Sequence, residues 1–223
     1  MDASVVEATI VLPNTKASSF SVGYKSNKPR AQVRCKMSEG ESRTVWTPVR
    51  VARVLAKNMP SFPCELDDFK RCVQVLENKV ALTMVAEMIE RRDHSSDEVR
   101  QKLFRYGFST VATDAAVSRA QELRFLDDNR FSRYFIEERK RRGWGQRKIE
   151  RELKLKGISP ESIPGYPEEF FSVDDDFERA YSLVQKKRVP DQRAFEKLVR
   201  FLMAKGFGYS VAADVVKRYL SSE

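Results

Sequence analysis

One pattern recurs three times along the chain. Two apolar residues lie four positions apart, and a glycine followed by another apolar residue comes four positions after the second. The three glycines, Gly107, Gly157 and Gly206, are 50 and 49 positions apart. A glycine at this place is typical of a helix end, where its left-handed conformation stops the helix and the next apolar residue folds back onto it. Three copies in register indicate a duplicated helical unit.

Each copy has room for three short helices. An apolar residue 22 positions before each glycine marks the buried face of a first helix: Val85, Phe135 and Val184. The second helix ends at the glycine, and Ser109 or Ser159 is placed to cap a third. In the middle unit, three prolines between positions 160 and 167 allow at most a short turn there. Because such small units bury their apolar faces poorly alone, we expect them to stack in tandem.

The helical pattern begins near residue 65, and the repeat predicts units at 65–126, 127–172 and 173–223. Residues 1–64 differ, with β-branched runs, turn formers and scattered prolines. Between Ala8 and Ser38 there is no acidic residue, but there are six basic ones: Lys16, Lys25, Lys28, Arg30, Arg34 and Lys36. Three interpretations stay open: an irregular or small β extension, a disordered basic tail that contacts nucleic acid, and an organellar transit peptide.

The composition excludes several classes of protein. Lys and Arg number 41 against 32 Asp and Glu, and the net charge of +9 favours an acidic partner over a merely solvated basic surface. No apolar run approaches the length of a membrane span, and no phosphate-binding loop for ATP is present. Three cysteines without CxxC spacing predict free thiols in a reducing compartment. With one histidine, a zinc site or a catalytic triad is not expected, and we expect no cofactor.

A long motif surrounds the middle repeat. It comprises Phe125–Phe131 (FLDDNRF), Arg139–Gly145 (RKRRGWG) and Arg147–Ile158 (RKIERELKLKGI). These residues resemble the signature of the RecX family, which has an L-D-D-x-R-F box, a basic R-x-x-x-G-x-G segment and then R-x-I-x-x-E-L-x-x-K-G-I. Arg91–Val99 is similar to the R-R-x-H-S-x-x-E-L start of that family's first unit. The resemblance runs from Val80 to Leu220, whereas residues 1–64 match no motif of the family.

The resemblance implies an all-α fold of three tandem three-helix repeats in an elongated, curved array. It also implies a non-enzymatic, cytoplasmic regulator that binds the RecA recombinase filament on DNA. Such a protein lowers the ATPase and strand-exchange activity of RecA, and so modulates recombination, repair and the SOS response. Direct binding to single-stranded and double-stranded DNA is a further implication. The alternative is a sequence-nonspecific nucleic-acid-binding helical module without a recombinase partner. Without a long heptad seam, we expect a monomer.

The candidate binding residues are basic side chains at helix ends, with one tryptophan among them. Arginine bridges phosphates or carboxylates with two hydrogen bonds, and tryptophan stacks on a base or fills a pocket of a partner. Gly143 and Gly145 are expected to leave the indole uncrowded and the turn flexible. The plain alternative is that Trp144 packs on the next helix while the arginines offset the helix dipole. The predicted set is Arg91, Arg92, Arg139, Lys140, Arg141, Arg142, Trp144, Arg147, Lys148, Lys186, Lys187 and Arg188.

Two acidic clusters, Asp127–Asp128 and Asp174–Asp176, have the residue types of a metal-dependent nuclease. Both come just before a predicted helix, where carboxylates accept hydrogen bonds from free N–H groups and face the positive end of the dipole. We therefore expect helix caps, and neither metal ligands nor catalytic residues. His94, at a predicted helix start, is likewise expected to be structural.

Overall fold

The computed structural model describes residues 4–14, 27–188 and 192–222, so Lys16 and Lys25 lie outside the described residues. The chain divides into two compact units, Met1–Leu126 and Asp127–Glu223, and each unit has its own apolar cores. The described residues are mostly helical, as predicted. The fold is nevertheless not all-α, because the first unit contains a small sheet. No helix in these ranges is long and apolar enough to cross a membrane.

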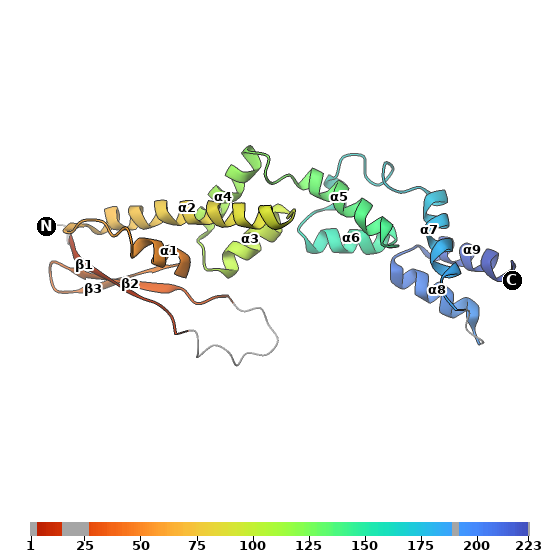
Figure 1. Cartoon of the computed structure of the whole chain (residues 1–223), viewed down its shortest axis with the longest axis horizontal. Helices are drawn as coiled ribbons and strands as arrows, with labels where there is room; N and C mark the ends of the chain where they lie inside the picture. The colour runs from red at the N-terminus through yellow and green to blue at the C-terminus, as the bar shows by residue number, and fades with distance from the viewer. Residues whose placement is uncertain (1–3, 15–26, 189–191, 223) are drawn as a thin grey trace. The chain divides into compact units, whose positions relative to one another are not determined.

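The sheet is antiparallel and follows the order β3-β2-β1-β4. Its strands are β1 (Ser4–Val11), β2 (Ala31–Met37), β3 (Ser42–Thr47) and β4 (Cys64–Glu65). Figure 1 labels the three longer strands, β1, β2 and β3. Alternate residues of β2 face one side, so Val33, Cys35 and Met37 are buried there. They pack on α1 (Val49–Leu55) and on the start of α2 (Leu66–Arg91). The interpretation of the extension as a small β structure is therefore confirmed.

The first unit continues with α2, α3 (Ser96–Arg105) and α4 (Thr110–Glu122), which share a second core. Ser95 begins α3 with a capping box, in which Ser95 and Glu98 accept each other's backbone N–H. Ser109 caps α4 as predicted, because its hydroxyl accepts the N–H of Ala112 at 3.2 Å. His94 is buried beside the capping box, with Nδ1 3.6 Å from a carboxylate oxygen of Glu98, which agrees with the expected structural role.

The second unit begins with α5 (Asp128–Arg141) and α6 (Gln146–Leu155), whose core includes Ile136, Ile149 and Leu153. A 3-10 turn, η2 (Pro160–Ser162), stands where a third helix would be, so the predicted effect of the prolines is confirmed. The capping role predicted for Ser159 is wrong. Its side chain caps nothing, because no α-helix follows it, and it hydrogen-bonds Glu161 instead.

The unit ends with α7 (Val173–Gln185), α8 (Ala194–Lys205) and α9 (Tyr209–Leu220) around a further core. Ser172 caps α7 by accepting the N–H of Asp175 at 3.2 Å. The helices thus follow one another in groups that the repeat anticipates, but the number of repeats and their boundaries stay a prediction.

All three repeat glycines have the left-handed conformation, with φ of +85° for Gly107, +71° for Gly157 and +99° for Gly206. The N–H of the following apolar residue donates to the carbonyl five positions earlier: Phe108 to Leu103 (3.2 Å), Ile158 to Leu153 (3.0 Å) and Phe207 to Leu202 (3.2 Å). This is the hydrogen bond of the Schellman motif, and it confirms the predicted helix ends.

Candidate nucleic-acid interface

The basic segment of the long motif forms the end of α5, the α5–α6 turn and the start of α6. Gly143 takes a left-handed φ of +75°, and the N–H of Trp144 donates to the carbonyl of Arg139 at 3.0 Å. The α5 helix therefore ends as the repeat helices do. This turn places Trp144 directly after the arginine run.

Trp144 is half-buried and packs against the core of α5 and α6. Two of the predicted cations lie over its ring, with the Arg139 guanidinium carbon 4.9 Å and the Lys148 ammonium 4.1 Å from the ring centroid. Arg139 also lies over Phe135 and pairs with Glu138 at 2.7 Å. Cation–π contacts of this kind hold both cations and the indole in one arrangement.

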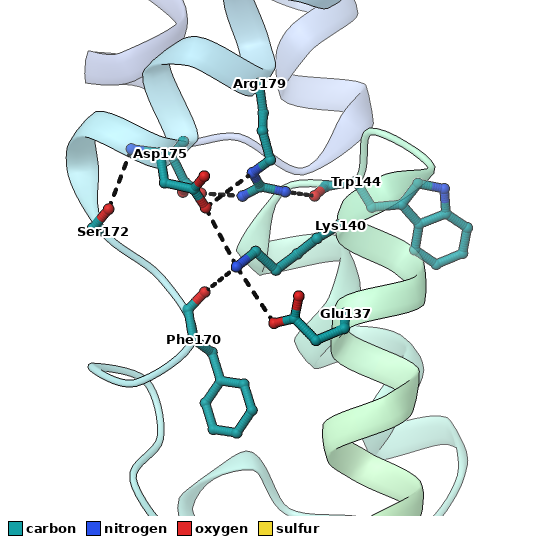
Figure 2. A network of polar contacts seen from close by, with 8 residues as sticks. Glu137, Lys140, Trp144, Phe170, Ser172, Asp175 and Arg179 are labelled. Carbon is teal, nitrogen blue, oxygen red and sulfur yellow. Dashed lines mark hydrogen bonds and ion pairs between the residues drawn. The ribbon is translucent and has the colours of Figure 1, made fainter.

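Lys140 points into the unit, where its charge is balanced (Figure 2). Its ammonium donates to the carbonyl of Phe170 at 2.6 Å and pairs with Asp175 at 3.3 Å and with Glu137 at 3.5 Å. Arg179 pairs with the same Asp175 oxygen and donates to the carbonyl of Trp144 at 2.9 Å. Lys140 and Arg179 therefore fix the α5–α6 turn to the start of α7.

The contacts of Arg179 with its acidic partners were not predicted from the sequence. Arg179 also pairs with Asp176, whose carboxyl is half-buried. Burial raises the pKa of Asp176 above its usual value, although the charge of Arg179 opposes this shift. Only the folded structure shows that these groups on α7 support the turn after α5.

The glycine beside Trp144 is tightly packed, so the predicted uncrowded and flexible turn is wrong. The N–H of Gly145 donates to the carbonyl of Lys205 at 2.9 Å, and the N–H of Arg147 donates to the carbonyl of Gly206 at 3.1 Å. A Cβ on Gly145 would lie 2.4 Å from the carbonyl carbon of Gly206. Only hydrogen atoms leave space for two backbones to approach so closely.

The remaining cations of this turn face solvent. Arg141 and Arg147 are exposed, and among the described residues neither side chain has a hydrogen-bond or ion-pair partner. Arg142 is exposed too and pairs with Glu138. The turn thus presents three exposed guanidinium groups, each of which can donate paired hydrogen bonds to a phosphate or a carboxylate.

The other predicted cations lie elsewhere. Lys186, Lys187 and Arg188 are exposed at the end of α7, where the Lys187 ammonium lies 4.0 Å from the centroid of the Phe201 ring. Arg91 and Arg92 belong to the first unit, at the end of α2. Arg92 pairs with Glu98 at 3.3 Å.

Both acidic clusters lie at helix starts, but the predicted capping role is confirmed for Asp127 and is wrong for Asp174–Asp176. Ser172 caps α7 instead, and Asp175 and Asp176 pair with Lys140 and Arg179. Asp127 caps α5 by accepting the N–H groups of Asn129 and Arg130, each at 3.0 Å. Asp174, Asp175 and Asp176 stand in the first turn of α7. Within the described ranges, no group of three His, Cys, Asp or Glu side chains is placed to hold a metal ion.

Comparisons with known proteins agree with this architecture. Residues 127–163 match a family model described as RecX, second three-helix domain. A regulatory protein RecX from Clostridium botulinum (strain Alaska E43 / Type E3) is 34% identical over 164 residues, covering 68% of this chain and 76% of the relative. A regulatory protein RecX from Vibrio vulnificus (strain CMCP6) is 34% identical over 128 residues, or 55% of this chain and 82% of the relative.

Two solved structures share the fold. RecX from Lactobacillus salivarius aligns with a TM-score of 0.56 at 15% identity, over 64% of this chain and 96% of that one. A second regulatory protein RecX aligns with a TM-score of 0.56 at 14% identity, over 97% of this chain and 99% of that one. The second alignment extends over most of residues 1–64, for which the sequence motifs gave no counterpart.

Proposed function

The chain belongs to the RecX family, and from this premise we propose that it binds the RecA recombinase filament on DNA and lowers the ATPase and strand-exchange activity of RecA. In this role the protein modulates recombination, repair and the SOS response. It works without a catalytic site of its own, as a cytoplasmic monomer.

The observation that carries this proposal is the rigid basic turn between α5 and α6. Arg141, Arg142 and Arg147 face solvent, while the residues around them are held by the core, by α7 and by the α8–α9 turn. Because the backbone of the turn is already held, binding phosphates or acidic side chains costs mainly the side-chain entropy of these arginines. We assign the contact to these three arginines, and to Trp144 and Lys148 at the edge of the turn.

The other members of the predicted set have different roles in this proposal. Arg139 and Lys140 position the turn, because their charges are already engaged within the unit. Further contacts are assigned to exposed cations after α7 in the same unit and, separately, at the end of α2 in the first unit: Lys186, Lys187, Arg188, Arg91 and Arg92. The helical part carries these cations on three consecutive three-helix repeats, each of which contributes a basic helix end.

The test is the single-stranded-DNA-dependent ATPase rate of the cognate RecA as the protein is added at substoichiometric amounts. The wild type should lower the rate, and an Arg141→Glu/Arg147→Glu variant should not. A Lys197→Glu/Arg200→Glu variant makes the same charge change at exposed positions of α8, and it should inhibit like the wild type. Inhibition by both variants would contradict the assignment of the turn.

A nucleic-acid-binding module without a recombinase partner is the competing function, and the exposed arginines and the +9 charge suit it as well. Its signature is DNA affinity that falls with salt, by about 0.7 log units per tenfold salt for each phosphate bound on a single strand. If the folded protein binds DNA in this way and leaves the RecA ATPase rate unchanged, the regulator proposal is wrong.

A further inference from the structure

A basic hollow of about 350 Å³ lies in the first unit between α1, α2 and the end of α3. Four of its lining residues are cations: Arg50, Arg53, Arg91 and Lys102. Among the described residues that line it, Glu87 is the one carboxylate, and it accepts hydrogen bonds from Arg50 at 2.8 and 2.9 Å. Three cations remain in excess, which is the charge balance of a site for an anion.

A second hollow, of about 420 Å³, adjoins the first and shares Arg50, Arg53 and Tyr106 with it. Its other lining residues are mostly apolar: Leu12, Pro13, Lys28, Pro29 and Val49. The N–H of Lys28 donates to the carbonyl of Arg105 at 2.7 Å, so this segment is held against the end of α3. A basic and an apolar hollow therefore meet at Tyr106.

Tyr106, where the two hollows meet, lies in a region of positive electrostatic potential. The Lys28 ammonium lies 3.9 Å from the centroid of the Tyr106 ring. A hydrogen bond from Lys28, together with the charges of Lys28, Lys102 and Arg50, lowers the pKa of the Tyr106 hydroxyl below its usual value, against the effect of burial. Cations from three different segments of the chain thus stabilise the ionised form of the same hydroxyl.

We propose that the paired hollows bind one nucleotide of a single-stranded nucleic acid, with the backbone phosphate in the basic hollow and the base against the apolar wall. Arginine and lysine are the usual phosphate ligands, and an unpaired base can leave its stack to cover an apolar surface. An acidic peptide would satisfy the cations but would leave the apolar hollow uncovered. The site rests on the proposed function in that the chain acts on DNA, but it lies in the other unit from the α5–α6 turn.

The test measures the affinity of the protein for a single strand and, separately, identifies the residues that contact it. Binding of a fluorescent oligothymidylate to the full chain is measured by anisotropy across a salt series, and a 4-thiothymidine strand is photocrosslinked and the linked peptides are identified by mass spectrometry. Because the photoreactive group is on the base, the wild type should crosslink at Tyr106 or at Pro29 and Val49 of the apolar hollow. Crosslinks confined to the second unit would overturn the proposal.

The variant is Arg53→Glu/Lys102→Glu, and the control is Arg43→Glu/Lys57→Glu, which makes the same charge change at exposed positions of this unit outside both hollows. The first should weaken binding about tenfold and lower the salt slope by about 0.7 for each phosphate that the variant no longer binds. The control should weaken binding less than about threefold, as expected for a purely long-range charge effect. Equal weakening in both variants, each shown to be folded by its thermal transition, would overturn the proposal.

Two further arms separate the sources of the anion. An abasic strand of the same length should bind the wild type more weakly; equal binding would overturn the nucleotide assignment in favour of a site for phosphate alone. Binding of a fluorescent poly-glutamate peptide at these hollows that excess oligothymidylate does not displace would overturn it in favour of an acidic protein segment. Because none of these measurements contains RecA, the nucleotide site and the regulator proposal fail independently.

Discussion

Gly145 and Gly206 meet backbone to backbone, although 60 residues of sequence lie between them. The N–H of Gly145 donates to the carbonyl of Lys205 at 2.9 Å, and a Cβ on Gly206 would lie 2.4 Å from the Cβ of Lys148. The glycine that ends α8 therefore has two functions. It supplies the left-handed conformation that stops the helix, and it receives the turn that carries the exposed arginines.

A Gly145→Ala substitution should lower the free energy of unfolding by about 1–3 kcal/mol, which is the usual cost of forcing an extra carbon into packed backbone. The φ of Gly145 is −83°, a value that alanine adopts readily, so the destabilisation would report the close packing and not backbone strain. Urea denaturation followed by circular dichroism measures it.

Gly208 provides the matched control. It also precedes a helix at a negative φ of −66°, but the nearest atom to an added Cβ, in the Arg147 side chain, is 4.0 Å away. Gly208→Ala should change stability by less than about 1 kcal/mol, because the restriction of the unfolded chain by alanine opposes its lower preference at a helix N-cap, a cost that both variants share. If both substitutions lower the free energy of unfolding equally, the close backbone packing at Gly145 does not account for the destabilisation.

Local features of this fold could be predicted from the sequence, whereas contacts between distant segments could not. The positions of Gly107, Gly157 and Gly206 predict helix ends, because the left-handed conformation is a local demand of the backbone. The inward turn of Lys140 depends on Asp175, which follows a proline-rich segment of unpredictable path. For the same reason the basic motif could be located in the sequence, while its division into exposed and internal cations required the structure.

The cap on α4 gives a second stability prediction. Ser109→Ala removes the hydroxyl that accepts the N–H of Ala112, and it should cost about 1 kcal/mol, within the range of about 0.5–2 kcal/mol for removal of a cap. Ser159 occupies the matching place in the next repeat but caps no helix. Ser159→Ala should therefore change stability by less than about 0.5 kcal/mol, and equal destabilisation at the two serines would contradict the difference seen between them.

The Arg50–Glu87 pair predicts a dependence of stability on pH. The hydrogen bonds from Arg50 lower the pKa of Glu87 below its usual 4.5. A carboxyl whose folded pKa is lowered stabilises the fold above its unfolded pKa, and this contribution is lost as the pH falls through the folded pKa. Since the side chains are 41% and 44% exposed, solvent screening limits the contribution at neutral pH to about 0.2–1 kcal/mol.

Glu87→Gln should therefore lower the urea midpoint at neutral pH, and the difference from the wild type should vanish in acid well below pH 4.5. Glu90→Gln, at an exposed position of the same helix, serves as the control and should be nearly neutral at both pH values. A deficit of the Glu87→Gln variant that persists in acid would mean that the pair acts through packing and not through charge.

Tyr106 tests the positive potential of the first unit without any ligand. Comparison of the ultraviolet titrations of wild type and Tyr106→Phe isolates this phenol from the other six tyrosines, and its midpoint should lie below the usual 10.0. Lys28→Gln should raise the midpoint, because it removes the hydrogen bond that contributes most to the shift. Added salt should raise it as well, since the charges of Lys102 and Arg50 are then screened.

Tyr166 provides an internal comparison in the same titration, because its pKa is shifted in the opposite direction to that of Tyr106. Burial and the hydrogen bond to Glu150 raise the pKa of Tyr166, so its phenolate should form after that of Tyr106. A saturating oligothymidylate should move the Tyr106 midpoint upward, because a phosphate in the basic hollow opposes ionisation of the neighbouring phenol. If Tyr106 titrates at or above 10.0 in the free protein, the cations around it do not act together, and a phosphate would gain little by binding there.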